Sequence, residues 1–224
     1  MSLIHIALYG QRSVSALLTE APDPFAFLVL AHGAGAGMRH HFLQSTTEAL
    51  ARHGVSVLRY QFPYMEAGSK RPDSPTVAQR AVRSAVSAGA ERAGTLPLFA
   101  GGKSYGGRMT SQAQAATPLP SVRGVVFFGF PLHPAGKPSV GRADHLFNVR
   151  VPMLFLQGSR DALADSVLIQ TVVDRLGPLA TMRIVREADH SFHVPARSGR
   201  TDAEILEDLI QQIAFWMRDV SSVG

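Results

Sequence analysis

Runs of consecutive apolar residues alternate along this chain with longer stretches in which apolar residues recur every three or four positions. The runs are typical of strands buried on both faces, and the longer stretches are typical of amphipathic helices. Two opening strands are expected at 2–9 and 13–19, joined around Gly10. Further strands are expected at 25–31, 55–62, 98–100, 122–130, 153–157 and 181–186. Helices are expected at 42–53, 76–93, 109–116, 166–176 and 201–218.

Strands that alternate with helices predict parallel βαβ units, and therefore a mostly parallel central sheet with helices on both faces. Thr76 is expected to cap the second helix, and residues 63–75 and 131–150 are expected to be connecting loops. We expect a single α/β domain spanning 1–224 with no large cap domain, because no gap between elements exceeds about twenty residues. The site should then be open and roofed only by loops.

Composition narrows the classes of function. The chain has no cysteine, which excludes disulfides, thiolate catalysis and cysteine-based metal sites. The N-terminus lacks the features of a signal peptide and no apolar run is long enough to span a bilayer, so we expect a cytoplasmic protein with no membrane partner. The formal net charge is +5, but the basic residues are scattered, which disfavours a nucleic-acid partner. The choice between monomer and homodimer stays open.

The most informative stretch is P-L-F-A-G-G-K-S-Y-G-G-R, from Pro97 to Arg108. It places a G-x-S-x-G pattern, centred on Ser104, between a short apolar strand and an Ala-rich helix. Where a strand becomes a helix within so few residues, the residue at the apex is strained, and flanking glycines avoid clashes with the neighbouring strand and helix. The Ser104 hydroxyl is then held at a helix N-terminus, where the dipole favours negative charge. The pattern predicts a nucleophile.

Two other interpretations of this stretch are open at first. The letters G-G-K-S also resemble the end of a phosphate-binding loop, but that motif requires glycine where this chain has Pro97. The residues between, 98–100, are moreover apolar and typical of a strand. The phosphate-binding loop is therefore disfavoured. A structural turn with an idle serine stays open until a base and an acid are found.

A serine nucleophile needs a general base, and the base needs an acid that orients it. Asp161 and His190 each follow a predicted strand, at the carboxyl edge where open α/β sheets place functional groups. The order serine, aspartate, histidine is that of the nucleophile-elbow hydrolases. Asp165 competes with Asp161 for the role of acid, and Asp161 could instead cap the next helix. His193 competes with His190, but no H-E-x-x-H pattern accompanies the pair, so no metal is expected.

An acyl-transfer site also needs N–H donors for an oxyanion. One is expected from Tyr105, and the second from the small-residue loop after strand 25–31, where Ala34 is preferred and Gly35 is next. The residues expected to contact substrate are His32, Gly33, Gly35, Tyr64 and His133. In the rim loop, Lys137 or Arg142 could hold a substrate anion, although solvated loop charges are favoured.

Taken together, these residues resemble the α/β-hydrolase superfamily, and within it the dienelactone-hydrolase-like branch of the KANL3/Tex30 type. The resemblance covers nearly the whole chain. It rests on A-H-G-A-G-A at 31–36, R-Y-Q-F-P-Y-M-E at 59–66, G-G-K-S-Y-G-G-R at 101–108, G-F-P-L-H-P-A-G-K-P at 129–138, L-F-L-Q-G-S-R-D at 154–161 and A-D-H-S-F at 188–192.

The resemblance implies an α/β-hydrolase fold with Ser104 as nucleophile, Asp161 as acid, His190 as base and no cofactor. Dienelactone hydrolases use a cysteine nucleophile, which this chain lacks, so an esterase or thioesterase is the better expectation. The predicted function is a serine hydrolase that cleaves a small-molecule carboxylic ester or thioester through an acyl-enzyme. The alternative is a catalytically idle binding or scaffold protein, because one protein of this branch is known as a complex subunit.

Overall fold

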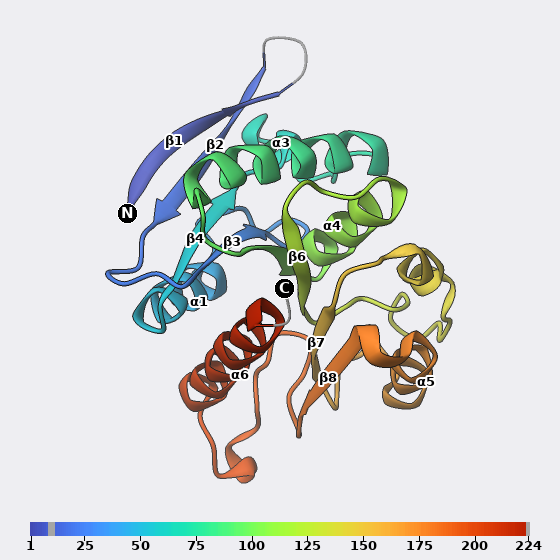
Figure 1. The fold of residues 1–224 in the computed structure, drawn as a ribbon. Helices are drawn as coiled ribbons and strands as arrows, with labels where there is room; N and C mark the ends of the chain where they lie inside the picture. The colour runs from blue at the N-terminus through green and yellow to red at the C-terminus, as the bar shows by residue number, and fades with distance from the viewer. Residues whose placement is uncertain (9–11, 223–224) are drawn as a thin grey trace.

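An eight-stranded sheet runs through the computed structural model, which describes residues 1–8 and 12–222 (Figure 1). The strand order is β1-β2-β4-β3-β5-β6-β7-β8. β1 pairs antiparallel with β2, β2 pairs antiparallel with β4, and every pairing from β4 to β8 is parallel. The strands are β1 (Ser2–Ala7), β2 (Ser13–Thr19), β3 (Ala26–Ala31), β4 (Val55–Tyr60), β5 (Leu98–Lys103), β6 (Val122–Phe128), β7 (Met153–Gly158) and β8 (Ala180–Val185).

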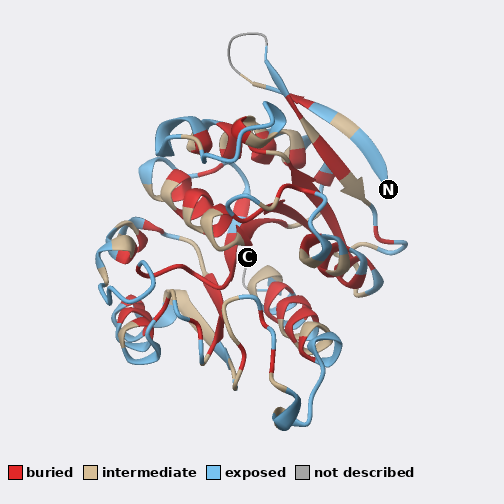
Figure 2. Cartoon of the chain, turned by 180° about the vertical axis from the view of Figure 1, so that it is seen from behind, coloured by how far each residue is buried: buried red, intermediate tan, exposed pale blue. Residues whose placement is uncertain are grey.

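Helices cover both faces of this sheet, as the apolar runs predict. The α-helices are α1 (His41–Arg52), α2 (Pro63–Glu66), α3 (Pro75–Ala93), α4 (Tyr105–Ala116), α5 (Ser166–Leu176) and α6 (Asp202–Ser222). α1 and α6 pack on one face, and α3, α4 and α5 pack on the other (Figure 1). Buried residues concentrate in the central strands and on the inward sides of the helices (Figure 2). In β3, covered from both sides, every residue is buried.

This architecture confirms the predicted α/β-hydrolase fold, and no cap domain covers the carboxyl edge of the sheet within the described residues. None of the described helices has the length and apolar character that a bilayer crossing requires. The predicted end of the first strand at Tyr9 and the turn at Gly10 lie outside the described residues.

Several predicted boundaries are wrong. β5 continues to Lys103 instead of ending at Ala100, because Gly101 lets it lie close to β6: a Cβ there would lie 2.2 Å from the Val126 carbonyl oxygen. β6 ends at Phe128, two residues early, because the chain turns at Gly129, whose φ is +70°.

The cap predicted at Thr76 is also wrong. Ser74 is the N-cap of α3, and Pro75 occupies the first helical position, where its missing N–H costs no intrahelical hydrogen bond. Both predicted loops contain helical turns: α2 lies within 63–75, and a 3₁₀ helix, η1 (Gly141–Asn148), lies within 131–150.

Candidate active site

Ser104 occupies a one-residue turn between β5 and α4. β5 ends at Lys103, α4 begins at Tyr105, and Ser104 has φ 51° and ψ −114°. A non-glycine residue in this region is strained, as the sequence predicts for the apex of the turn. A Cβ on Gly102 would lie 2.7 Å from the Ala31 carbonyl oxygen, and one on Gly106 would lie 2.5 Å from that of His32. The need for glycine on both sides of the serine is thereby confirmed.

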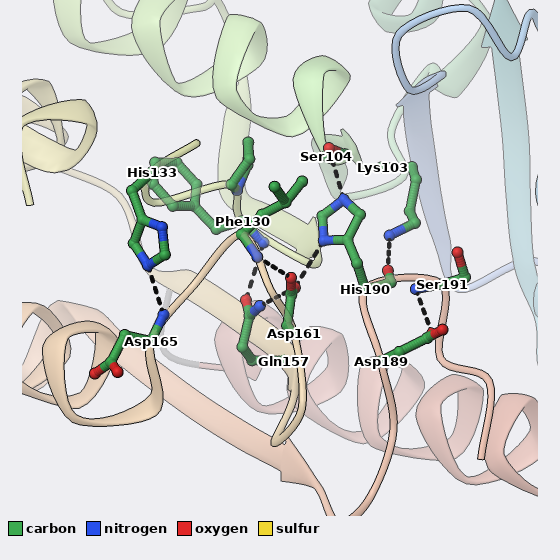
Figure 3. A network of polar contacts seen from close by, with 12 residues as sticks. Lys103, Ser104, Phe130, His133, Gln157, Asp161, Asp165, Asp189, His190 and Ser191 are labelled. Atoms are coloured by element: carbon green, nitrogen blue, oxygen red, sulfur yellow. Dashed lines mark hydrogen bonds and ion pairs between the residues drawn. The ribbon is translucent and has the colours of Figure 1, made fainter. Parts of the chain in front are cut away.

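Three side chains from three strand ends meet at this turn (Figure 3). The Ser104 Oγ lies 2.8 Å from His190 Nε2, and His190 Nδ1 lies 2.7 Å from Asp161 Oδ2. As a carboxylate, Asp161 only accepts hydrogen bonds, so it places the imidazole proton on Nδ1. The lone pair of Nε2 then faces Ser104, whose hydroxyl donates to it. The Asp161 side chain is fully buried, whereas 23% of the His190 side chain is exposed.

The Asp161 carboxylate is held from two further directions. The backbone N–H of Leu163 donates to Oδ1 at 2.8 Å, and the side-chain amide of Gln157 donates to Oδ2. The Gln157 carbonyl oxygen in turn accepts from the Phe130 N–H at 3.0 Å. Gln157 is not among the residues that we predict to form the site. The signal was an isolated amide within the apolar strand M-L-F-L-Q-G, since a buried polar side chain needs partners.

The competing aspartate and histidine lie elsewhere. Asp165 caps α5, where its Oδ1 accepts from the N–H groups of Val167 and Leu168, each at 3.0 Å. His193 Nδ1 lies 2.8 Å from an oxygen of Asp202, and both side chains are largely exposed. His190 and His193 therefore point to different carboxylates. Among the residues of 1–8 and 12–222, no three His, Asp or Glu side chains lie together as metal ligands would.

Ser104 and His190 open into a cavity of about 340 Å³ at the carboxyl edge of the sheet. Its apolar walls are Ala34, Ala36, Phe42, Leu43 and Leu163, and Gly33, His40, Lys103 and Ser191 complete the lining. A larger cleft of about 440 Å³ lies between the end of β8 and α6, but it does not include Ser104 or His190. Of these two cavities, only the smaller is lined by Ser104 and His190.

The two residues predicted to supply N–H donors, Tyr105 and Ala34, each have a backbone N–H that stays a candidate for this role. Tyr105 is the first residue of α4, so its N–H is among those without an intrahelical acceptor. Ala34 lines the same cavity as Ser104, and no acceptor for its N–H lies among the described residues. Gly35, the second choice for this donor, is directed elsewhere, because its N–H donates to the Tyr64 hydroxyl at 2.9 Å.

Four of the five residues predicted to contact substrate lie outside this cavity; Gly33 lines it. Gly35 and Tyr64 bond to each other, and the Tyr64 side chain is buried behind the loop. His32 is fully buried: its Nε2 accepts from the Phe62 N–H at 3.1 Å and its Nδ1 donates to the Gly33 carbonyl at 2.7 Å. Burial lowers the pKa of His32 to about 4, so the ring is neutral and structural.

His133 is likewise a structural residue. Its Nε2 accepts from the Asp165 N–H at 2.8 Å, and its Nδ1 donates to the Pro134 carbonyl at 2.9 Å (Figure 3). The predictions of substrate contact for His32, Gly35, Tyr64 and His133 are therefore corrected. A sequence cannot show that both nitrogens of a histidine are already bonded to the backbone.

A second serine–histidine pair joins α4 to η1, where Ser111 Oγ is 2.8 Å from His145 Nε2. This pair differs from the first in two ways. Ser111 is fully buried, and its Oγ also lies 3.0 Å from the Arg108 carbonyl oxygen, so the hydroxyl is not available to a substrate. Burial lowers the pKa of His145 to about 4, and none of its hydrogen bonds in the described structure is to a carboxylate. The Ser111–His145 pair is structural.

A family model described as an alpha/beta hydrolase domain matches residues 24–218 of the chain. The chain belongs to this family. Solved structures with similar folds agree with the fold of this α/β hydrolase. An alpha-beta serine hydrolase homologue from Coxiella burnetii is 16% identical, with a TM-score of 0.76 over 94% of this chain and 96% of that one.

Two further structures are similar to this hydrolase. An α/β serine hydrolase without a lid from Xanthomonas campestris is 18% identical, with a TM-score of 0.74 over 96% of this chain and 94% of that one. A dienelactone hydrolase from Anabaena variabilis is 19% identical, with a TM-score of 0.75 over 97% and 96%. At such identities the likeness concerns the fold.

Proposed function

We propose that this α/β hydrolase is a serine hydrolase that cleaves carboxylic esters or thioesters through an acyl-enzyme. The observation that carries the proposal is the hydrogen-bonded series Ser104–His190–Asp161, whose serine and histidine open into a cavity that Ala34 also lines. Structural neighbours named as serine hydrolases support the same reaction class.

In this proposal Ser104 attacks the acyl carbon while its proton passes to His190 Nε2. The carboxylate of Asp161 stabilises the imidazolium that forms. The N–H groups of Tyr105 and Ala34 stabilise the negative oxygen of the tetrahedral intermediate. His190 then returns the proton to the departing alcohol or thiol, and an acyl-enzyme remains on Ser104.

A water molecule completes the cycle. His190 Nε2 removes a proton from it, the resulting hydroxide attacks the acyl carbon, and Ser104 leaves with the proton of the imidazolium. The products are a carboxylic acid and the free serine enzyme. No redox partner or metal enters this balance.

The cavity walls favour an uncharged, apolar group of the substrate. Ala34, Ala36, Phe42, Leu43 and Leu163 present no charge to it. Transfer of apolar surface from water into such a cavity is favourable. Lys103 also lines the cavity, but its ammonium already donates to the His190 carbonyl. We therefore propose esters or thioesters of uncharged acyl groups as the substrate class.

The test is hydrolysis of p-nitrophenyl acetate, butyrate and octanoate and of the matching thioesters. Wild type should turn over at least one of them, and Ser104→Ala should lose the activity while keeping its thermal stability. Ser111→Ala is the matched control, because it removes a hydroxyl that also contacts a histidine but lies outside the cavity. Retained activity in Ser104→Ala would refute the assignment.

A further inference from the structure

Lys103 is a charged residue at the end of a buried strand. It is the last residue of β5, all of whose other residues are buried, and it directly precedes Ser104 in the G-x-S-x-G pattern. Its ammonium does not point to solvent. Instead, Nζ donates a hydrogen bond to the backbone carbonyl of His190, and the side chain lines the cavity at Ser104 (Figure 3).

Aromatic rings and a glycine form the slot that holds this ammonium. Nζ lies 5.7 Å from the ring centroid of Phe42 and 5.1 Å from that of Phe192, within the range of cation–π attraction. A Cβ on Gly129 would lie 3.0 Å from Nζ and 3.3 Å from the imidazole of His190. The positive φ and absent side chain of Gly129 thus leave room for lysine and histidine to lie side by side.

The loop that carries His190 has several other hydrogen bonds. At its start, the Arg160 N–H donates to the Ala188 carbonyl and the Glu187 N–H donates to Ser159 Oγ, which ties the loop to the segment after β7. The Asp189 carboxylate accepts from the N–H groups of Ser191 and His193, and the Asp189 N–H donates to the His193 carbonyl. These bonds fix the internal shape of the loop. The bond from Lys103 is different, because it joins this loop to the strand that ends at Ser104.

We infer that Lys103 is a positioning residue: its ammonium ties the backbone of His190 to the strand that carries Ser104 and so keeps the imidazole within hydrogen-bond distance of the serine. The inference rests on the proposed function, since it concerns the alignment of the Ser104–His190 pair. A hydrogen bond from a charged donor is about twice as strong as a neutral one, and a misplacement of about 1 Å can slow a reaction about a hundredfold.

The ionisation of Lys103 provides a readout of this role. Burial lowers the pKa of Lys103 to about 8, although the charges of Asp161 and Asp189 oppose the shift. The other titratable groups that face it are His190, whose carbonyl it contacts, and His40, which lines the same cavity. The turn after β6 places only Gly129, which does not titrate, against Nζ. Above about pH 8 the ammonium loses its charge, so the tie to His190 weakens and kcat should fall.

This fall in kcat should not accompany unfolding. In the unfolded chain Lys103 keeps its ordinary pKa of 10.5, so between about pH 8 and 10.5 the unfolded state binds more protons than the folded state. The contribution of Lys103 to the free energy of unfolding therefore rises with pH over the same interval in which kcat declines. A lysine with only a structural role would not make kcat fall while the free energy of unfolding rises with pH.

The absence of cysteine permits a direct replacement experiment. Lys103→Cys has a unique thiol, which is alkylated in denaturant and refolded. 2-Bromoethylamine restores an ammonium with a thioether in place of the γ-methylene, and iodoacetamide gives a neutral side chain as the matched control. Wild type is treated in the same way, and thermal unfolding and mass spectra verify each sample.

For p-nitrophenyl acetate, kcat of the iodoacetamide product and of Lys103→Met should fall about ten- to a hundredfold, with KM changed less than about threefold. The aminoethyl product should recover to within about fivefold of wild type. The alkaline decline near pH 8 should be absent in Lys103→Met. Wild-type kcat in the neutral variants, or a wild-type kcat that is level to pH 9.5, would overturn the inference. Absence of wild-type turnover would instead overturn the proposed function itself.

Discussion

Replacement of Asp161 by Asn tests how the carboxylate controls the imidazole. As a carboxylate, Asp161 accepts three hydrogen bonds: from the Leu163 N–H at Oδ1, and from Gln157 and His190 at Oδ2. An Asn amide has one oxygen and one NH₂ group, so in either orientation its NH₂ group faces a donor. If NH₂ replaces Oδ1, it faces the Leu163 N–H, and this backbone group cannot rotate to another acceptor.

If NH₂ replaces Oδ2 of Asp161, it faces the Gln157 amide and favours the wrong tautomer of His190, with the proton on Nε2. Rotation of the Gln157 amide does not help, because its NH₂ group would then face the Phe130 N–H. One buried donor without an acceptor costs about 1–3 kcal/mol, so Asp161→Asn should lower the free energy of unfolding by about that amount. In the orientation with NH₂ at Oδ2, which keeps an acceptor for the Leu163 N–H, the tautomer change should lower kcat about 10⁴-fold, which is about 5 kcal/mol of transition-state stabilisation.

The assay is ester hydrolysis by Asp161→Asn and Gln157→Leu, with urea denaturation of both. Gln157→Leu removes one donor to the carboxylate but leaves His190 its acceptor, so its kcat should fall far less than that of Asp161→Asn. A kcat for Asp161→Asn within tenfold of wild type would refute the reasoning, because the Asn amide would then leave the tautomer of His190 unchanged.

Three other expectations test the packing, the cavity and the rejected histidine. Gly106→Ala places a methyl 2.5 Å from the His32 carbonyl, so urea denaturation should show a loss of roughly 3 kcal/mol; a loss below about 1 kcal/mol would contradict the packing argument. Ala36→Phe fills part of the cavity, so kcat/KM for the octanoate ester should fall about tenfold more than for the acetate. His193→Gln should leave kcat within about twofold of wild type. The bond to Asp202 raises the pKa of His193, so the wild-type protein should be more stable than His193→Gln below pH 6.5. This difference in the free energy of unfolding should vanish as the pH rises through the raised pKa. Urea denaturation at several pH values measures it.

The sequence was sufficient for the features that depend on order and spacing. The apolar runs predicted the strands, and the turn at Ser104 was predictable because glycines on both sides of a serine, between a strand and a helix, are typical of a nucleophile elbow. Asp161 and His190 were predictable from their positions after strands. The structure shows that these residues meet, since the carboxyl ends of β5, β7 and β8 lie on one edge.

The sequence was insufficient to predict the role of a residue whose hydrogen-bond partners come from distant parts of the chain. His32 and His133 are polar residues in loops near the site, and such residues are reasonable candidates for substrate contact. Only the fold shows that backbone groups occupy both nitrogens of each ring, one of them from a distant segment. Lys103 and Gln157 were missed for the converse reason, because their partners are a backbone carbonyl and a carboxylate brought close by the sheet.

The central claim is that Ser104 is a nucleophile activated by His190. The most direct measurement is reaction of the purified protein with a fluorophosphonate probe, with the modified peptide identified by mass spectrometry. Wild type and Ser111→Ala should be labelled at Ser104, whereas Ser104→Ala and His190→Ala should not be labelled. Folded wild-type protein that fails to react, or label that persists in Ser104→Ala, would contradict the account.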